Sequence, residues 1–122
     1  MANENQIEVW AQLKVSAGQG EAFRAIAGQM IEAVDTQEPG CTRYHWFLTD
    51  GDSECSVSEL YDDSAALLAH FRGTAIVDLA PNLFTVAELT RLEVHGSPSP
   101  EAAEAVAAFG TAILKAFSGI NR

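Results

Sequence analysis

Positively charged residues are scarce in this sequence. The 122 residues include 7 Lys and Arg against 17 Asp and Glu, which gives a formal net charge of -10. Binding to nucleic acid or to an anionic membrane surface relies on basic side chains that neutralise phosphates. The charge balance therefore excludes nucleic acid and lipid surfaces as partners.

Cysteine and histidine are also few, and neither forms a pattern that binds a metal. The two cysteines, Cys41 and Cys55, match no paired ligand spacing and do not make a secreted disulfide framework. The three histidines have no second ligand nearby at helical or strand spacing. Because no glycine-rich phosphate loop is present either, we expect free thiols, no metal and no cofactor.

Long apolar runs are missing too. No segment approaches the ~20 apolar residues of a membrane span, and the start of the chain lacks a basic stretch followed by an apolar one. We therefore expect an unprocessed cytoplasmic protein that spans no membrane. Hydrophobic residues make up 48% of the chain, which is enough for one core in a single domain.

The first half of the chain reads as strand, helix, strand, strand. Residues 7–15 alternate apolar and polar side chains, as a half-buried strand does. Apolar residues recur at helical spacing from Phe23 to Val34, until Pro39 and Gly40 end the pattern. Residues 42–48 and 55–61 are rich in aromatic and β-branched side chains around a Thr-Asp-Gly-Asp-Ser turn, which predicts an antiparallel hairpin.

The second half adds a helix and a strand. Asp62, Asp63 and Ser64 offer N-caps for a helix that Gly73 ends, and a short helical stretch over 74–79 should end near Pro81. Residues 84–95 return to β-type composition. With right-handed crossovers, this order predicts an α+β, ferredoxin-like β-α-β-β-α-β fold, whose four-stranded antiparallel sheet carries both helices on one face.

A Gly-Ser-Pro-Ser-Pro break at 96–100 separates a C-terminal extension from this unit. Apolar residues at steps of three and four predict one continuous extra C-terminal helix with Ser99 as its N-cap; they are Ala102, Val106, Phe109, Ile113, Phe117 and Ile120. We divide the chain into a ferredoxin-like domain at 1–96 and a helical extension at 97–122. The apolar stripe must be buried, either on its own subunit or across a dimer.

The hairpin fixes which residues share a face. If Thr49 opposes Glu54, the opposed pairs are Leu48 with Cys55, Trp46 with Val57, Tyr44 with Glu59 and Thr42 with Tyr61. One face is then aromatic and apolar with a single carboxylate, while the other is more polar. In this register the two cysteines lie ~23 Å apart, too far to be bridged within one chain.

Glu59 and His70 are the candidate catalytic residues. A carboxylate on an apolar face is desolvated, which raises its pKa and suits it to acid or base work. Glu59 could equally be a rim residue in an ion pair. His70, near the end of its helix, could face the same space between helix and sheet, or could simply interact with the helix dipole.

Three short motifs occur in order along residues 7–95: a glycine turn before Glu-Ala-Phe, the run Glu-Pro-Gly-Cys followed by Tyr44, and Glu-Leu-Tyr-Asp leading to Ala69-His70. Together they resemble the antibiotic-biosynthesis-monooxygenase family of dimeric ferredoxin-like proteins. The resemblance implies a homodimer. It leaves the activity open, because members include cofactor-independent oxygenases of polyketide phenols, quinol monooxygenases, haem-degrading enzymes and proteins with no known activity.

Two branches of that family differ from this sequence at their functional positions. The haem-degrading branch uses an axial His and a strand-one Asn, and these positions correspond to about Ala80 and Ala11 here. The quinol-type members resemble this chain at Ala69-His70, but a second His that they carry falls at about Ala75. The alignment therefore predicts no bound haem and leaves the quinol-type activity without one of its histidines.

The resulting hypothesis is a cofactor-independent monooxygenase that acts on a small aromatic substrate of the quinol or phenol type. His70 or Glu59 would be the catalytic base in a pocket between helices and sheet. The substrate-binding residues would be Trp46, Tyr61, Leu67 and Phe71 as walls and Arg91 as an anchor. The alternative is a non-catalytic ligand-binding or structural dimeric member of the same fold. A cavity of at least ~300 Å³ beside His70 and Glu59 would favour the enzyme.

Overall fold

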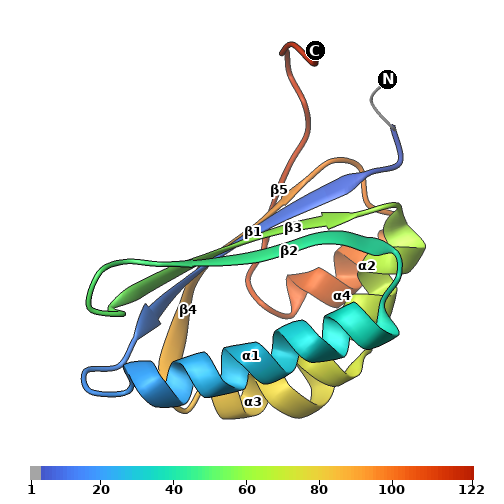
Figure 1. Ribbon diagram of the computed structural model, residues 1–122. Helices are drawn as coiled ribbons and strands as arrows, with labels where there is room; N and C mark the ends of the chain where they lie inside the picture. The colour runs from blue at the N-terminus through green and yellow to red at the C-terminus, as the bar shows by residue number, and fades with distance from the viewer. Residues whose placement is uncertain (1–3) are drawn as a thin grey trace.

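The computed structural model describes residues 4–122 and contains one five-stranded sheet with helices on one side (Figure 1). In chain order its elements are β1 (Ile7–Val15), α1 (Gly20–Gln37), β2 (Cys41–Leu48), β3 (Glu54–Tyr61), α2 (Ser64–Phe71), the π-helical turn η1 (Ala75–Leu79), α3 (Ala80–Leu83), β4 (Ala87–His95), α4 (Pro100–Ala107) and β5 (Ala112–Leu114).

The sheet has the strand order β2-β3-β1-β4-β5. Its first four strands pair antiparallel, which confirms the ferredoxin-like arrangement predicted from the element order. The short β5 pairs parallel with the edge of β4 and was not predicted. Figure 1 shows the helices gathered on one side of the sheet, so that side holds the core and the other side is left open.

Strand β1 lies at the centre and shows how the alternating sequence makes two faces. Five residues of one parity are buried under the helices: Ile7, Val9, Ala11, Leu13 and Val15. The residues between them, from Glu8 to Lys14, point to the open side. The predicted bounds of this strand, 7–15, are those observed.

The hairpin of β2 and β3 has the predicted register over most of its length. Tyr44 pairs with Glu59, and the pairs at 46/57 and 48/55 follow in step. A bulge between Cys41 and Arg43 shifts the end of the ladder, so Cys41 rather than Thr42 opposes Tyr61. The predicted register therefore holds for Tyr44, Trp46 and Leu48, which face the helices. Both cysteines are free thiols.

Pro81 begins a helical turn instead of ending one. It occupies the first turn of α3, where a missing N–H and a fixed φ are tolerated, and the helical backbone continues from η1 through Leu83. Strand β4 consequently starts at Ala87, three residues later than predicted.

The C-terminal extension is helical only in its first part. Ser99 caps α4 by accepting a hydrogen bond from the Ala102 N–H, as predicted, and Ala102 and Val106 are buried against α2 of the same chain. The helix ends at Ala107 because Gly110 takes a left-handed conformation with φ of 72° and the chain turns to pair with β4.

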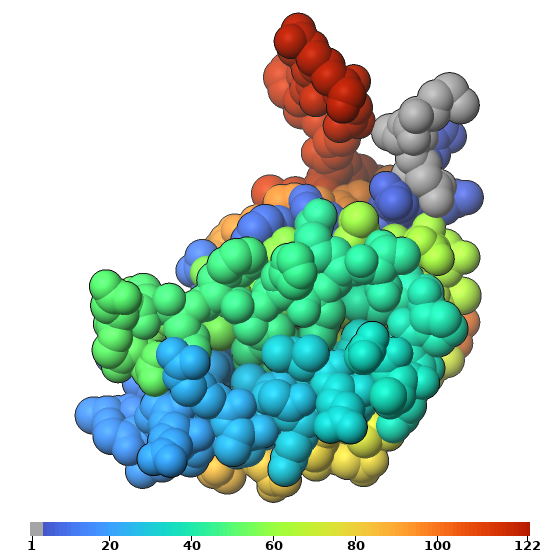
Figure 2. Space-filling model, viewed as in Figure 1, coloured from blue at the N-terminus to red at the C-terminus, as the bar shows by residue number. Residues whose placement is uncertain are grey.

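The prediction of one helix through Ile120 is therefore wrong. Phe117 is fully exposed and Ile120 is 75% exposed, so the last part of the apolar stripe covers nothing in this chain. Figure 2 shows residues after β5 standing away from the body as an arm.

No helix within residues 4–122 is long and apolar enough to cross a membrane.

Candidate functional site

A buried histidine between two carboxylates forms the chemical centre of the inner face. His70 is 1% exposed, and its Nδ1 lies 2.9 Å from Glu38 Oε1. Its Nε2 lies 3.8 Å from Glu59 Oε1, and both glutamates are themselves less than 9% exposed. Three buried ionisable side chains from α2, β3 and the end of α1 thus meet on the inner face of the sheet.

Helix α2 brings His70 to this position. Asp63 caps the helix by accepting a hydrogen bond from the Ala66 N–H, and the spacing of three residues places Leu67 and His70 on the same buried side. His70 is therefore held by a packed helix and not by a loop.

Two glycines let the end of α1 approach α2 closely enough for Glu38 to reach His70. A Cβ at Gly40 would lie 2.7 Å from the Ala66 Cβ on α2, and a Cβ at Gly73 would lie 3.3 Å from Glu38 Oε2. A side chain at Gly40 would push the end of α1 away from α2, and one at Gly73 would crowd the Glu38 carboxylate.

Glu59 reaches the same space from the middle of β3. The Tyr61 hydroxyl donates a hydrogen bond of 2.5 Å to Glu59 Oε1. Burial raises the pKa of Glu59 above its ordinary value, and the Glu38 charge adds to this, whereas His70 and the Tyr61 hydroxyl act in the opposite direction. The raised pKa makes Glu59 a better proton donor or acceptor near neutral pH than an ordinary carboxylate.

The neighbouring phenols and thiol remain protonated at neutral pH. Burial raises the pKa of Tyr44 and of Tyr61 well above 10, and the Glu59 charge adds to both shifts. Burial also raises the pKa of Cys41 to about 11, again with help from Glu59 and Glu38. A thiol with that pKa is a poor nucleophile at pH 7, so Cys41 is a packing residue here.

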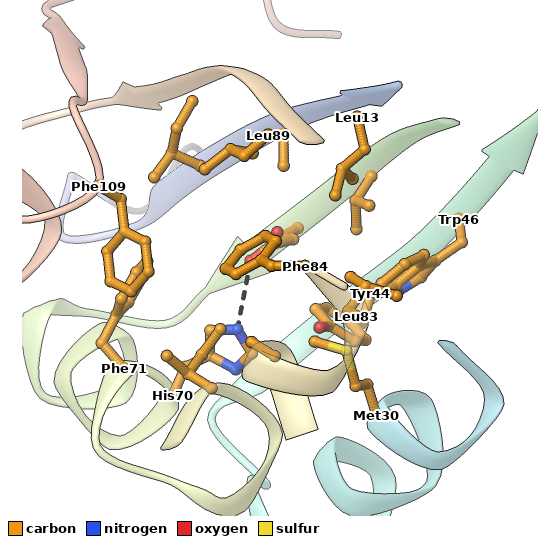
Figure 3. Close-up of a pocket in the computed structure, with 16 residues that line it drawn as sticks. Leu13, Met30, Tyr44, Trp46, His70, Phe71, Leu83, Phe84, Leu89 and Phe109 are labelled. Atoms are coloured by element: carbon orange, nitrogen blue, oxygen red, sulfur yellow. Dashed lines mark ion pairs between the residues drawn. The ribbon is translucent and has the colours of Figure 1, made fainter. Parts of the chain in front are cut away.

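The space beside His70 and Glu59 is an apolar pocket with a cavity of about 60 Å³ (Figure 3). The dashed line in Figure 3 marks the pair of His70 and Glu59 at one wall. The remaining lining is almost wholly apolar or aromatic: Ala11, Leu13, Met30, Tyr44, Trp46, Val57, Phe71, Ile76, Ala80, Leu83, Phe84, Leu89, Leu92 and Phe109. The cavity falls short of the ~300 Å³ that a small-molecule site usually offers.

Two phenylalanines close the mouth of this pocket. Phe84, Leu89 and Phe109 also line an open depression of about 400 Å³ on the outside. Figure 3 draws the Phe84 ring in the centre of the lining side chains, and Phe84 is 41% exposed.

Trp46 lines the pocket, and its side chain carries a buried polar atom. Its indole N–H is buried and makes no hydrogen bond with any residue in 4–122. The ring packs edge to face on Tyr44, with ring centres 5.8 Å apart. The indole slightly opposes the rise in the Tyr44 pKa, but the contact does not reach hydrogen-bond geometry. A buried N–H without an acceptor is unfavourable unless another molecule supplies one.

The structure brings together some of the predicted site residues and separates others. His70, Glu59, Trp46 and Phe71 line the pocket. Leu67 and Tyr61 are fully buried and lie outside the lining, Tyr61 as the hydrogen-bond donor to Glu59.

Arg91 is on the wrong side of the sheet for the role of anchor. Leu92 and Val94 point inward, so the alternation of β4 turns Arg91 outward, where it pairs with Glu93. The substrate-binding role predicted for Arg91 is therefore incorrect.

Glu38 is the functional residue that sequence reasoning missed. It directly precedes the Pro39-Gly40 stop that ends the helical pattern, and its contact with His70, 32 positions away, depends on tertiary packing. The one available signal was a glutamate directly before a Pro-Gly helix stop, which does not by itself indicate where the carboxylate points.

Metal and haem ligands are not found at this site. No group of three or more His, Cys, Asp or Glu residues that could hold a metal ion occurs within 4–122. Ala11 and Ala80, the positions corresponding to ligands of the haem-degrading branch, both line the pocket, and their methyl groups cannot ligate iron.

Solved structures share this fold, over most or nearly all of the chain. MupZ from Pseudomonas fluorescens has a TM-score of 0.80 at 24% identity, over 97% of this chain and 95% of its own. A conserved protein from Methanosarcina mazei has a TM-score of 0.68 at 19% identity, over 78% and 95%. Rv0793 from Mycobacterium tuberculosis has a TM-score of 0.64 at 22% identity, over 77% and 96%. These likenesses establish the fold.

A search of curated proteins gives no match to this sequence. The sequence model described as "Antibiotic biosynthesis monooxygenase" matches residues 6–80, which is more than half of the chain and includes β1, α2 and every residue of the Glu38–His70–Glu59 group. This chain therefore belongs to the antibiotic biosynthesis monooxygenase family.

Proposed function

We propose that this protein binds a small aromatic molecule of the phenol or quinol type and oxidises it with O2 without a cofactor. The observation that carries the proposal is the buried His70, whose Nε2 reaches a pocket that is otherwise apolar. Such a pocket excludes water and keeps a base beside the substrate, which is what a reaction driven by the substrate's own electrons requires.

In the proposed reaction, His70 Nε2 removes the proton of the substrate hydroxyl. The electron-rich ring of the phenolate then reduces O2 and forms a C–O bond at a ring carbon, giving a peroxide. Glu59, as the carboxylic acid, protonates the outer peroxide oxygen. Loss of the C–H proton at that carbon and cleavage of the O–O bond give a carbonyl and water, so phenol plus O2 becomes quinone plus water.

The charges around the pocket favour an uncharged substrate. Glu59 and His70 line the wall with Glu38 behind them, and no Lys or Arg from the described part of the chain lines the pocket. A carboxylated or sulfonated aromatic would be buried beside carboxylates without a counterion, which is strongly unfavourable. The Trp46 N–H supplies a donor for a carbonyl or ether oxygen at the other end of a neutral molecule.

The small cavity favours a second candidate, a non-catalytic ligand-binding protein or one whose pocket is filled by its own side chains. About 60 Å³ is less than a phenol needs, so either role requires Phe84 or Phe109 to move. If these rings stay in place, the domain is a structural one. Replacing Phe84 with Ala should enlarge the pocket and tighten binding if the ring is a gate.

Oxygen uptake against a panel of quinols and anthrones, with purified protein and no added cofactor, tests the enzyme. Uptake that depends on protein and is lost in His70→Ala supports it. Binding of a quinol, measured by calorimetry, without oxygen uptake in either wild type or Phe84→Ala would favour the non-catalytic role.

We also propose that the protein is a cytoplasmic homodimer that buries the open face of its sheet. Phe47 is 55% exposed there, and Trp10 and Leu60 are half-buried among polar side chains. An apolar group of this kind on an uncovered sheet face is typical of an interface. Sedimentation at micromolar concentration should give the mass of two chains, and a monomer would contradict the proposal.

A further inference from the structure

We propose that Glu38 is a positioning residue, which fixes the tautomer of His70 and holds its Nε2 toward the pocket. The kinetic part of this inference rests on the proposed function of His70 as a base. The structural part, the tautomer itself, does not depend on any reaction.

The distances assign the two ring nitrogens different partners. Nδ1 lies 2.9 Å from Glu38 Oε1, which is a hydrogen bond, whereas Nε2 lies 3.8 Å from Glu59 Oε1, which is too long for one. Because a carboxylate can only accept, the proton of a neutral imidazole belongs on Nδ1. Nε2 then keeps its lone pair on the side of the ring where Glu59 and the pocket lie.

Glu38 contacts the histidine and not the pocket. It does not line the pocket, so it cannot touch a substrate there. It is 7% exposed and follows α1 directly, with its own N–H bonded to the Val34 carbonyl. Gly40 and Gly73 leave no room for side chains between this end of α1 and α2. The carboxylate is therefore held by backbone packing on both sides.

The other groups facing His70 do not compete for Nδ1. Tyr44 on β2 and Tyr61 on β3 stack around the ring at 5.3 Å and 5.4 Å between ring centres. Cys41 lies in the same cluster as a protonated thiol, and Glu59 faces Nε2. When His70 accepts a proton, Glu38 stabilises the imidazolium that forms, as a carboxylate behind a catalytic histidine does.

Long-range 1H–15N spectra of histidine-labelled protein at pH 8 test the tautomer directly. The signal missing in His70→Ala identifies His70 among the three histidines. We expect a protonated Nδ1 and an unprotonated Nε2 in the wild type. In Glu38→Gln, whose amide can also donate, we expect a substantial fraction with the proton on Nε2.

The matched control is Glu32→Gln, on the exposed side of α1, which should leave the His70 signals unchanged. A wild-type spectrum with Nδ1 unprotonated, or with both nitrogens protonated, overturns the proposal. So does a Glu38→Gln spectrum identical to the wild type. If Glu38→Gln fails to fold, the wild-type spectrum still decides.

The kinetic test uses any substrate that the wild type turns over. Glu38→Gln should lower kcat by about 10-fold to 100-fold with little change in KM, because the substrate does not contact Glu38. Glu38→Asp should recover part of the loss, and Glu32→Gln should match the wild type. If kcat is unchanged in Glu38→Gln, the positioning role is wrong. If the wild type turns over nothing, the proposed function fails while the tautomer result stands.

Discussion

The protein contains two histidines that each lie between two glutamates, on opposite faces of the same sheet. On the inner side, His70 has Glu38 at 2.9 Å and Glu59 at 3.8 Å. On the outer side, His95 has Glu93 at 2.9 Å and Glu8 at 3.6 Å. The distances are nearly the same, but the His70 side chain is 2% exposed and that of His95 is 38% exposed.

Burial and counterions make these two groups chemically different. On the outer face, Arg43 pairs with Glu8 and Arg91 pairs with Glu93, so each carboxylate has a cation besides the histidine. On the inner face, the side-chain partners of the two glutamates among residues 4–122 are His70 and the Tyr61 hydroxyl. The same residue types at the same distances therefore do not make a reactive site by themselves. Water and counterions weaken the electrostatic interaction between a histidine and its carboxylates, and on the outer face both are present.

The two histidines should differ most in their effect on catalysis. On a phenol or quinol that the wild type oxidises, His70→Ala should lower turnover by roughly 10²-fold or more, because the reaction loses its base. His95→Ala removes an identical side chain from the open face and should leave turnover unchanged. Steady-state oxygen uptake measures both. Equal activity in wild type and His70→Ala would remove His70 from the mechanism.

The glutamates beside the two histidines should differ next in their effect on stability. Glu38→Ala leaves a buried histidine without its partner and should lower the free energy of unfolding by about 3 kcal/mol. Glu93→Ala removes a partner at the same distance from His95, but on the face that is open in a single chain, and should cost less than Glu38→Ala. Urea unfolding at pH 7 checks both variants. A large loss in Glu93→Ala would show that the outer network is stronger than its exposure indicates.

The smallest difference is in how stability depends on pH. Burial raises the pKa of Glu59, so the folded protein holds this proton more tightly than the unfolded chain, and stability should fall as pH rises above about 4.5. Hydrogen bonds from His95 and Arg91 lower the pKa of Glu93, so its contribution should be lost as pH falls below about 4.5.

Melting temperatures measured from pH 3 to pH 8 separate these two effects. Glu59→Gln should flatten the decline toward high pH, and Glu93→Gln should flatten the decline toward low pH. The same slope in Glu59→Gln as in the wild type would mean that the pKa of Glu59 is the same in the folded protein as in the unfolded chain.

Local patterns predicted the fold well because each element carries its own signal. The alternation over 7–15 gave β1 its bounds, and turn chemistry gave the pairs of 44 with 59 and 46 with 57. The prediction of one C-terminal helix was wrong because the spacing of apolar residues carries no information about the turn at Gly110, where the chain leaves the helix. Pro81 misled because the same residue can end one helix or begin the next.

The site was predicted only where it depends on strand alternation or helix spacing. Glu59 follows from the register of the hairpin, and His70 follows from its place on α2. Glu38 depends on how α1 and α2 approach each other, which no local pattern specifies. Arg91 could have been placed correctly, since Leu92 and Val94 on either side of Glu93 already define the inner face of β4.

The three residues of β5 also change how this sheet meets other chains. Open sheet edges can template unwanted pairing between molecules, and a short covering strand is one way to block them. Here β5 pairs with the last three residues of β4, Glu93–His95, whereas within residues 4–122 the rest of that edge and the outer edge of β2 pair with no strand. The second of these edges is β2. That edge is interrupted by the bulge beside Arg43, a positively charged residue. Each edge is therefore protected against edge-to-edge growth only over one end of its strand.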